Sequence, residues 1–175
     1  KVLTGQIFKA AEDFIDRYEN VALAGFQYDY FAKAKTILPA FYMNTRIYSC
    51  ILIKNDLPYR WRGRYNEDTD LSLQMLKDGF CTIQFNAFLQ EKATTQTIKG
   101  GNTAEFYAKE GTFMKSKMQV DLHPDVSRMV ERFGRIHHFV DYTPFKKNKL
   151  ILRKDLELPK TVDNYGMELV IRPEV

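Results

Sequence analysis

The chain has 175 residues, of which 45% are apolar, 14% aromatic and 27% charged. This length and apolar content predict one domain with a single core, and the charged fraction, near the average of folded proteins, argues against disorder. The net charge of +4 permits contact with a polyanion without requiring it. Two cysteines exclude a disulfide framework and favour a reducing compartment, the cytoplasm. No apolar run approaches the roughly 18 residues of a membrane span, so we expect no membrane contact.

Helical and apolar stretches alternate along the chain, which predicts an α/β sheet. The segment 67–77 predicts a helix, because acidic residues fill its first turn, apolar residues follow and Gly79 ends it. The strongest strand is predicted over 46–54, and 81–89 alternates polar and apolar residues like a half-buried strand. The remaining predicted elements are helices over 7–18, 103–109 and 125–133 and strands over 21–26 and 150–152. The chain opens without an initiator Met directly into a helix, so we expect a fragment of a longer protein.

An acidic cluster, Asn66-Glu67-Asp68-Thr69-Asp70, stands between an arginine-rich loop and the 67–77 helix. A helix N-terminus carries partial positive charge, so an ordinary solvated first turn explains the cluster by itself. Asp68-x-Asp70 is also a pattern that holds Mg or Mn with a diphosphate, although so short a pattern arises by chance as well. A carboxylate that faces a cleft at this point can accept a hydroxyl proton as a general base.

A second cluster, Arg135 to Tyr142, contains His137 and His138. A strand sends neighbouring side chains to opposite faces, so at most one of the two histidines points into a given site. Neutral imidazole is a common metal ligand, and Asp141 is near enough in sequence to orient one. An ordinary surface or core pair of histidines explains the cluster equally well.

Two loops offer further binding groups. Lys99-Gly100-Gly101-Asn102 can present backbone amides to a phosphate or sugar, but it lacks the surroundings of a P-loop, and a plain turn is the simpler interpretation. The loop 58–65 interleaves arginines with aromatic residues, which can grip phosphates and stack on an exposed base. A solvated loop with its aromatic side chains packed down is the alternative. The candidate nucleic-acid contacts in it are Arg60, Trp61, Arg62, Arg64 and Tyr65.

Three motifs in this order resemble the TET-associated glycosyltransferases. They are Arg64-Tyr65-Asn66-Glu67-Asp68-Thr69-Asp70-Leu71, Lys99-Gly100-Gly101-Asn102 and His137-His138-x-Val140-Asp141-Tyr142, all within residues 1–150. The resemblance implies a GT-A-like enzyme of phage type, acting in the bacterial host cytoplasm, with a mixed sheet flanked by helices. It implies transfer of a sugar from a nucleotide sugar, such as a UDP-sugar, to hydroxymethylated pyrimidines in DNA, for example hydroxymethylcytosine, with divalent Mn or Mg. Residues 151–175 are then expected to form a C-terminal extension.

The resemblance also implies roles for individual residues. Asp68 is the expected general base, and Glu67 would position the acceptor hydroxyl. The expected metal ligands are His137, His138 and Asp70, and the expected donor or phosphate contacts are Gly100, Gly101 and Asn102. GT-A enzymes normally carry a metal-binding acidic triplet on a strand that would precede the 7–18 helix, and the sequence has no such strand. We therefore expect part of the N-terminal nucleotide-binding half to be missing, with Asp68-x-Asp70 as a stand-in being the alternative.

Three other functions remain open at this point. The carboxylate chemistry does not identify the acceptor, so a glycosyltransferase of the same fold that acts on protein or glycan is the nearest alternative. A non-catalytic DNA-binding module that kept the fold is the second. A metal-dependent nuclease is the third, disfavoured because no lysine completes a compact acidic-x-Lys set near Glu67.

Overall fold

The computed structural model describes residues 5–33, 35–92 and 112–157. Its centre is a four-stranded sheet in the order β2-β4-β1-β3. The strands are Val21–Tyr28 (β1), Phe41–Met43 (β2), Ile51–Ile53 (β3) and Cys81–Gln90 (β4). β1 and β4 run parallel, whereas β3 is antiparallel to β1 and β2 is antiparallel to β4. This mixed sheet confirms the predicted α/β class.

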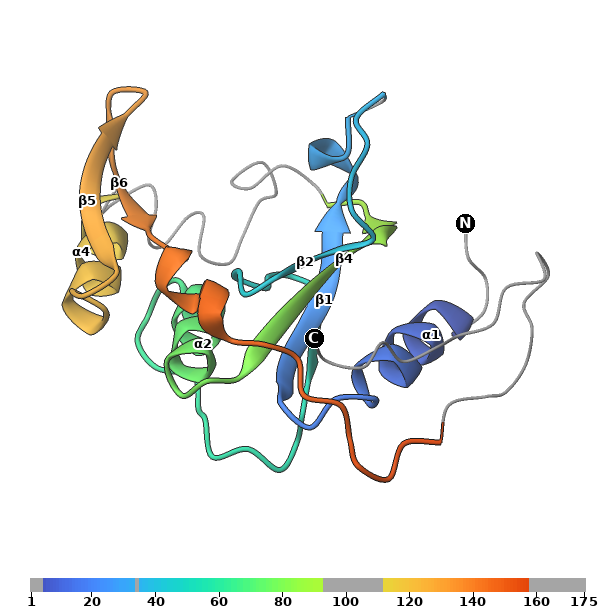
Figure 1. Cartoon of the computed structure of the whole chain (residues 1–175). Helices are drawn as coiled ribbons and strands as arrows, with labels where there is room; N and C mark the ends of the chain where they lie inside the picture. Colours follow the sequence, from blue (N-terminus) through green and yellow to red (C-terminus); the bar gives the residue numbers. More distant parts are fainter. Residues whose placement is uncertain (1–4, 34, 93–111, 158–175) are drawn as a thin grey trace.

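Two helices, α1 (Gln6–Ile15) and α2 (Glu67–Lys77), lie on opposite sides of the sheet (Figure 1). On the α1 side, Ala24, Phe26 and Ile83 are buried, and on the α2 side Leu23 packs with Met75. Fully burying a large apolar side chain contributes roughly 1.5–3 kcal/mol. Because β1 is covered on both faces, it reads in the sequence as a continuous apolar run rather than as an alternating one.

The direction of α2 places its acidic end near the outgoing ends of the central strands. β1 and β4 are parallel, and α2 lies between them in the chain. The backbone amide of Cys81, which begins β4, donates to the carbonyl of Asn20 just before β1, with 2.8 Å between N and O. The C-terminus of α2 is therefore at the incoming (N-terminal) ends of both strands. Its N-terminus points toward the outgoing (C-terminal) ends. In open α/β sheets that is the edge where ligands bind.

A second layer packs against the far side of α2 and consists of α4 (Phe113–Leu122) and the hairpin β5 (Ser127–Arg132)–β6 (Arg135–Val140). α4 contacts both strands of this hairpin. The side chains that join the layer to α2 are Leu73, Leu76, Val126, Phe145 and, partly buried, Val140. Phe145 belongs to a short 3-10 helix, Thr143–Lys147, which follows β6. Figure 1 shows α2 between this layer and the main sheet.

Residues 125–133, predicted as helical, instead contain the whole of β5, and this prediction was wrong. Phe133 and Gly134 both have positive φ, 54° and 66°, as the two-residue turn of a tight hairpin requires. That turn pairs Arg132 with Arg135 and fixes the register of the whole hairpin. Helix α4 was not predicted, and the predicted helix over 103–109 lies outside the described residues.

The predicted strand over 46–54 is confirmed only at its end, as β3. Ser49 has a φ of 68°, in the left-handed region, which turns the chain before β3 begins. The preceding residues pass close over β1, where a Cβ at Gly25 would lie 2.4 Å from the Cys50 carbonyl oxygen and 2.5 Å from the Ile47 side chain. A glycine is needed there because the two backbones approach so closely.

β4 departs from the predicted half-buried pattern, since Thr82 and Gln84 are buried along with their apolar neighbours. The cause is the segment between β2 and β3, which crosses this face: Thr82 Oγ1 donates to the Thr45 carbonyl and accepts from the Thr45 amide. At the other end of the chain, the predicted strand 150–152 amounts to one bridge between Tyr18 and Leu152. Among the described residues no helix is long and apolar enough to cross a membrane.

Candidate functional site

The acidic cluster lies where the sequence predicted it, in the first turn of α2. The residue before the helix, Asn66, has a φ of 50° and is buried, and its side-chain amide donates to the Lys115 carbonyl at 2.9 Å. This bond ties the start of α2 to α4. Glu67, Asp68 and Asp70 then occupy the first turn, where the partial positive charge of the helix end favours them.

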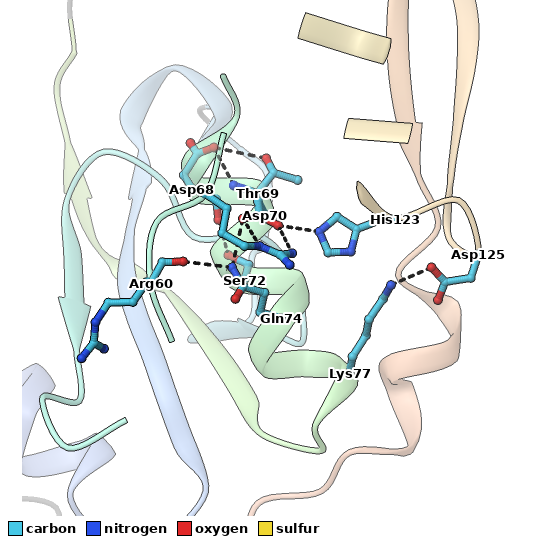
Figure 2. Close-up of polar contacts among 10 residues, drawn as sticks. Arg60, Asp68, Thr69, Asp70, Ser72, Gln74, Lys77, His123 and Asp125 are labelled. Carbon is cyan, nitrogen blue, oxygen red and sulfur yellow. Dashed lines mark hydrogen bonds and ion pairs between the residues drawn. The ribbon is translucent and has the colours of Figure 1, made fainter. Parts of the chain in front are cut away.

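Asp70 is completely buried and fully hydrogen-bonded. Arg62 binds it with two nitrogens, Nε to Oδ2 at 3.1 Å and Nη2 to Oδ1 at 2.6 Å. Gln74 Nε2 donates to Oδ2 at 2.9 Å, and His123 Nε2 lies 2.8 Å from Oδ1. The carboxylate can only accept, so His123 carries its proton on Nε2. Figure 2 shows His123 reaching Asp70 from the end of α4.

The partners of Asp70 keep it ionised. Burial by itself raises the pKa of Asp70, but the hydrogen bonds from His123 and Arg62 and the Arg62 charge outweigh it and hold the pKa below its ordinary value. A buried charge with this many partners is typical of a structural ion pair that joins a loop to a helix. Asp70 thereby links the 58–65 loop, α2 and the end of α4.

The predicted metal ligands are not brought together as a set. Both Asp70 oxygens are occupied by protein donors, and no group of three or more potential metal-ligating His, Cys, Asp or Glu side chains occurs among the described residues. His137 and His138 are neighbours on β6 and point to opposite faces, as the sequence predicted for a strand. The described residues alone therefore do not fit a metal ion, and a metal role for these residues stays a prediction.

Asp68 differs from Asp70 in having an open oxygen. Its Oδ1 accepts from the Thr69 backbone amide at 2.6 Å and from Thr69 Oγ1 at 3.2 Å, as Figure 2 shows. Its Oδ2 has no hydrogen-bond partner among the described residues. The side chain is half-buried, whereas Glu67 beside it is exposed. Asp68 is thus held by one oxygen and available through the other.

Among the described residues, the Asp68 charge affects the pKa of Tyr48, His138 and Tyr142. Burial, reinforced by the charges of Lys115 and Arg46 and opposed by Asp68, lowers the pKa of His138 to about 4. His138 is consequently neutral near pH 7. Burial likewise raises the pKa of Tyr48 and of Tyr142, so both phenols stay protonated. We call Arg46, Tyr48, Asp68, His138 and Tyr142 the Asp68 cluster.

The Asp68 cluster continues onto the sheet through two glutamines. Tyr48 OH donates to Gln27 Oε1 at 3.0 Å, and Gln27 Nε2 donates to Gln84 Oε1 at 3.4 Å. Gln27 stands near the outgoing end of β1 and Gln84 on the neighbouring strand β4. The polar network therefore runs from the start of α2 to the outgoing edge of the two parallel strands.

The arginine and aromatic loop, 58–65, is only partly directed to solvent. The Arg60 guanidinium donates to the carbonyls of Leu57 and Tyr59, and Arg62 is committed to Asp70. Tyr65 is buried, and Arg64 lies over its ring with 5.7 Å between Cζ and the ring centroid. Trp61 remains half exposed, at 51%. The predicted phosphate donors Gly100 and Gly101, with Asn102, lie outside the described residues.

Sequence reasoning missed several members of this network. Arg46, Tyr48, Gln27 and Gln84 received no functional role, and His123 was not singled out at all. The sequence around these residues has the ordinary composition of strands and loops. Their contacts also join residues far apart in the chain, up to 57 positions between Gln27 and Gln84. The sequence carried one signal, a glutamine within the predicted strand 81–89 and another directly after the predicted strand 21–26, since a buried amide needs a partner.

The fold and the site define a mixed α/β protein with a half-buried carboxylate, Asp68, that has one open oxygen at the start of α2. The family model described as TET-Associated Glycosyltransferase matches residues 2–101, more than half of the chain. The chain belongs to this family and is a glycosyltransferase. The match includes Asp68 and all four strands of the main sheet, but it stops before β6 and His138. No curated protein and no solved structure matches the chain.

Proposed function

We propose that this glycosyltransferase moves a sugar from a nucleotide-sugar donor to the hydroxyl of hydroxymethylated pyrimidine bases in DNA, with Asp68 as the general base. The observation that carries the proposal is the open Oδ2 of Asp68, on a carboxylate whose Oδ1 is fixed by Thr69. A general base needs such a fixed orientation and one oxygen within reach of the substrate. The family supports the transfer chemistry, and its association with TET enzymes supports a modified base as acceptor.

In the proposed step the acceptor hydroxyl oxygen forms a bond to the anomeric carbon of the donor sugar. The bond from that carbon to the donor phosphate breaks, and the nucleoside diphosphate leaves with the bonding electrons. Asp68 Oδ2 takes the hydroxyl proton. Direct displacement with one base inverts the anomeric carbon, so we propose an inverting reaction.

The neighbours of Asp68 support this step by their protonation states. His138 is neutral near pH 7, so its imidazole can hold the acceptor hydroxyl by a hydrogen bond without adding charge. Arg46 and Lys115 supply positive charge close by, as their effect on His138 indicates. Such cations can stabilise the negative charge that builds up on a departing diphosphate. Dependence on Mn or Mg is also proposed, and loss of activity on chelation by EDTA tests it.

DNA contact is proposed for the exposed part of the 58–65 loop. Trp61 is half exposed and offers an aromatic face, and Arg64, three residues further along the loop, is exposed. Aromatic faces stack on unpaired bases, and guanidinium groups bind phosphates. A base inside duplex DNA has to be reached in the major groove or turned out of the stack, and a stacking side chain assists the second route.

The test is nucleoside mass spectrometry of hydroxymethylated DNA incubated with the protein, Mn and a mixture of nucleotide sugars. We expect a new nucleoside heavier by one sugar, whose mass identifies the donor class. The same DNA without hydroxymethyl groups is the matched control and should give no product. Transfer to a peptide or glycan but not to DNA would contradict the proposed acceptor. Salt-dependent DNA binding without nucleotide-sugar binding would contradict transfer itself.

A further inference from the structure

A pocket of about 370 Å³ adjoins the Asp68 cluster on the α2 side of the sheet. Tyr142, whose phenol feels the Asp68 charge, forms one wall. Gln27 and Gln84 on β1 and β4 form its floor, and the segment after β2, which includes Asn44, forms another wall. Lys146 is the one charged residue among the described residues that line it. The volume suits one ring of the size of a nucleobase or a sugar.

The hydrogen bonds of the lining residues show which end of each buried amide is paired and which end is not. Gln27 Oε1 accepts from the Tyr28 amide and from Tyr48 OH, each at 3.0 Å, so its Nε2 must point to Gln84 Oε1. By hydrogen-bond geometry this leaves Gln84 Nε2 without a partner among the described residues, although Gln84 lies close enough to Tyr48 to lower the pKa of its phenol. Amide orientation is normally assigned from such networks, and here two acceptor bonds at one oxygen determine it.

Asn44 is oriented in the same way from the other wall. Its Nδ2 donates to the carbonyls of Phe145 and Asn148, each at 2.9 Å. Its Oδ1 is therefore the free end, and it has no partner among the described residues. Asn44 has a φ of 55° and is 6% exposed, so a turn that few residues adopt holds this oxygen in place.

Three buried polar atoms without partners among the described residues belong to residues of this one pocket: Asn44 Oδ1, Gln84 Nε2 and Tyr142 OH. Gln84 is 4% exposed, and Asn44 is nearly as deeply buried. Each unsatisfied buried group costs about 1–3 kcal/mol, so a fold rarely keeps three together unless something pairs with them. The set consists of one obligatory acceptor, one obligatory donor and one hydroxyl that can serve as either.

We propose that this pocket binds the neutral ring of the acceptor substrate through a donor and an acceptor group on one edge. Among the described residues no carboxylate lines the pocket, and the one cation of that lining, Lys146, is exposed. A donor on such an uncharged ring pairs with Asn44 Oδ1, an adjacent acceptor pairs with Gln84 Nε2, and either of the two groups can share the Tyr142 hydroxyl. A nucleobase edge has this pattern, and so do two neighbouring sugar hydroxyls. The proposal rests on the proposed function, because a ring beside the general base is the one whose hydroxyl the base deprotonates.

The variants that test this site are Tyr142→Phe and Gln84→Met, which remove a free hydroxyl and a free donor. Calorimetric titration with 5-hydroxymethyl-2′-deoxycytidine and 5-hydroxymethyl-2′-deoxyuridine, and with a methyl glycoside, measures binding without any donor sugar. We expect each variant to weaken binding of the ring by about five- to tenfold, the value of one hydrogen bond. Tyr142→Phe should also leave the melting temperature unchanged or raise it, because it removes an unpaired buried hydroxyl.

Tyr59→Phe is the matched control, since its hydroxyl is already paired with Asp78 Oδ2 at 2.7 Å, away from the pocket. We expect it to bind every probe as the wild type does. Unchanged binding in both pocket variants overturns the pocket assignment even if transfer to DNA is observed. Binding of the glycoside alone, weakened by the variants, supports the pocket but overturns DNA as the acceptor. Failure of the wild type to bind any of the three probes overturns the pocket.

Discussion

Asp68 and Asp70 stand two positions apart in the same helical turn, yet they are in opposite situations. A separation of two residues turns the side chain by about 200° around a helix, so the two carboxylates leave the helix on different sides. Asp70 is completely buried against Arg62, His123 and Gln74. Asp68 is half-buried with one oxygen open. The same pattern in the sequence has therefore given one side chain that holds the structure and one that can meet a substrate.

The contrast separates two uses of an ionised carboxylate. A fully partnered buried carboxylate has no open oxygen, and withdrawing it from its partners is costly. A carboxylate with one fixed and one open oxygen is oriented but still able to take a proton. The Asp-x-Asp pattern, taken at first as a possible metal pair, is better understood here as two independent sites. Each of the following predictions tests one side of this comparison.

The largest expected effect is on turnover in Asp68→Asn. The amide keeps the shape but cannot accept the hydroxyl proton, so we expect the transfer rate to fall by about 10²- to 10⁴-fold. The melting temperature should change little, because the Asp68 side chain bonds only Thr69 within the described residues. Product quantified by mass spectrometry at saturating substrates measures the loss. Asp13→Asn, at an exposed position on α1, is the matched control. Turnover that survives in Asp68→Asn would assign the base to another residue.

The second expected effect is on stability in Asp70→Asn. Removing the charge leaves Arg62 without its partner and places an amide among donors, so we expect the free energy of unfolding to fall by roughly 3 kcal/mol or more. Urea denaturation followed by circular dichroism measures it. Arg62→Ala should cost less, since the Arg62 side chain is 46% exposed and the other partners of Asp70 remain. A stable Asp70→Asn protein that has lost only activity would reverse the assignment and return Asp70 to the active site.

The fold was predictable from the sequence where local signals agree. Helix α2 matches its prediction of 67–77 because acidic residues, an apolar face and Gly79 all mark the same boundaries. β5 was mistaken for a helix because its hairpin depends on the positive φ of Phe133, and a phenylalanine gives no signal for such a turn. The predicted alternation in β4 failed for a different reason, since a distant segment covers Thr82 and Gln84.

The candidate site was predictable only in part, for the same physical reason. Local charge and helix position were enough to single out Asp68. The state of Asp70 depends on His123, which is 53 residues away and reaches it only through the packing of α4 on α2. The free ends of Asn44 and Gln84 depend on bonds made by other residues across the sheet. Tertiary contacts of this kind leave no periodic trace in a single sequence.

The third prediction concerns the neighbour of Asp68, His138, and the dependence of stability on pH. The folded protein holds the pKa of His138 at about 4, below the ordinary 6.5. Between these values the unfolded chain binds a proton that the folded chain does not, so stability falls as the pH drops from 6.5 to 4. The loss from this one group is at most roughly 3 kcal/mol. Urea denaturation at several pH values measures it, and His138→Gln should flatten this slope.

A direct measurement separates His138 from other titrating groups. NMR titration of the His138 ring should give a midpoint near pH 4 in the folded protein. A midpoint at the ordinary value would show that the imidazole is open to water and that the burial beside Asp68 is not maintained in solution. It would also remove the argument that His138 is neutral when it meets the acceptor hydroxyl.

The smallest expected effect concerns the 58–65 loop, which tests whether Asp70 and its partner Arg62 are purely structural. The loop was first predicted to bind DNA through all its arginines, but Arg62 is bonded to Asp70. We therefore expect Trp61→Ala with Arg64→Ala to weaken DNA binding by about tenfold and to reduce its salt slope by about one. Arg62→Ala should lower stability and leave the salt slope unchanged. Fluorescence anisotropy with labelled DNA over a range of salt concentrations measures the affinity and its salt slope.

A reduced salt slope in Arg62→Ala, with an unchanged slope in the double variant, would mean that Arg62 leaves Asp70 to bind phosphate. Asp70 would then not be a purely structural carboxylate.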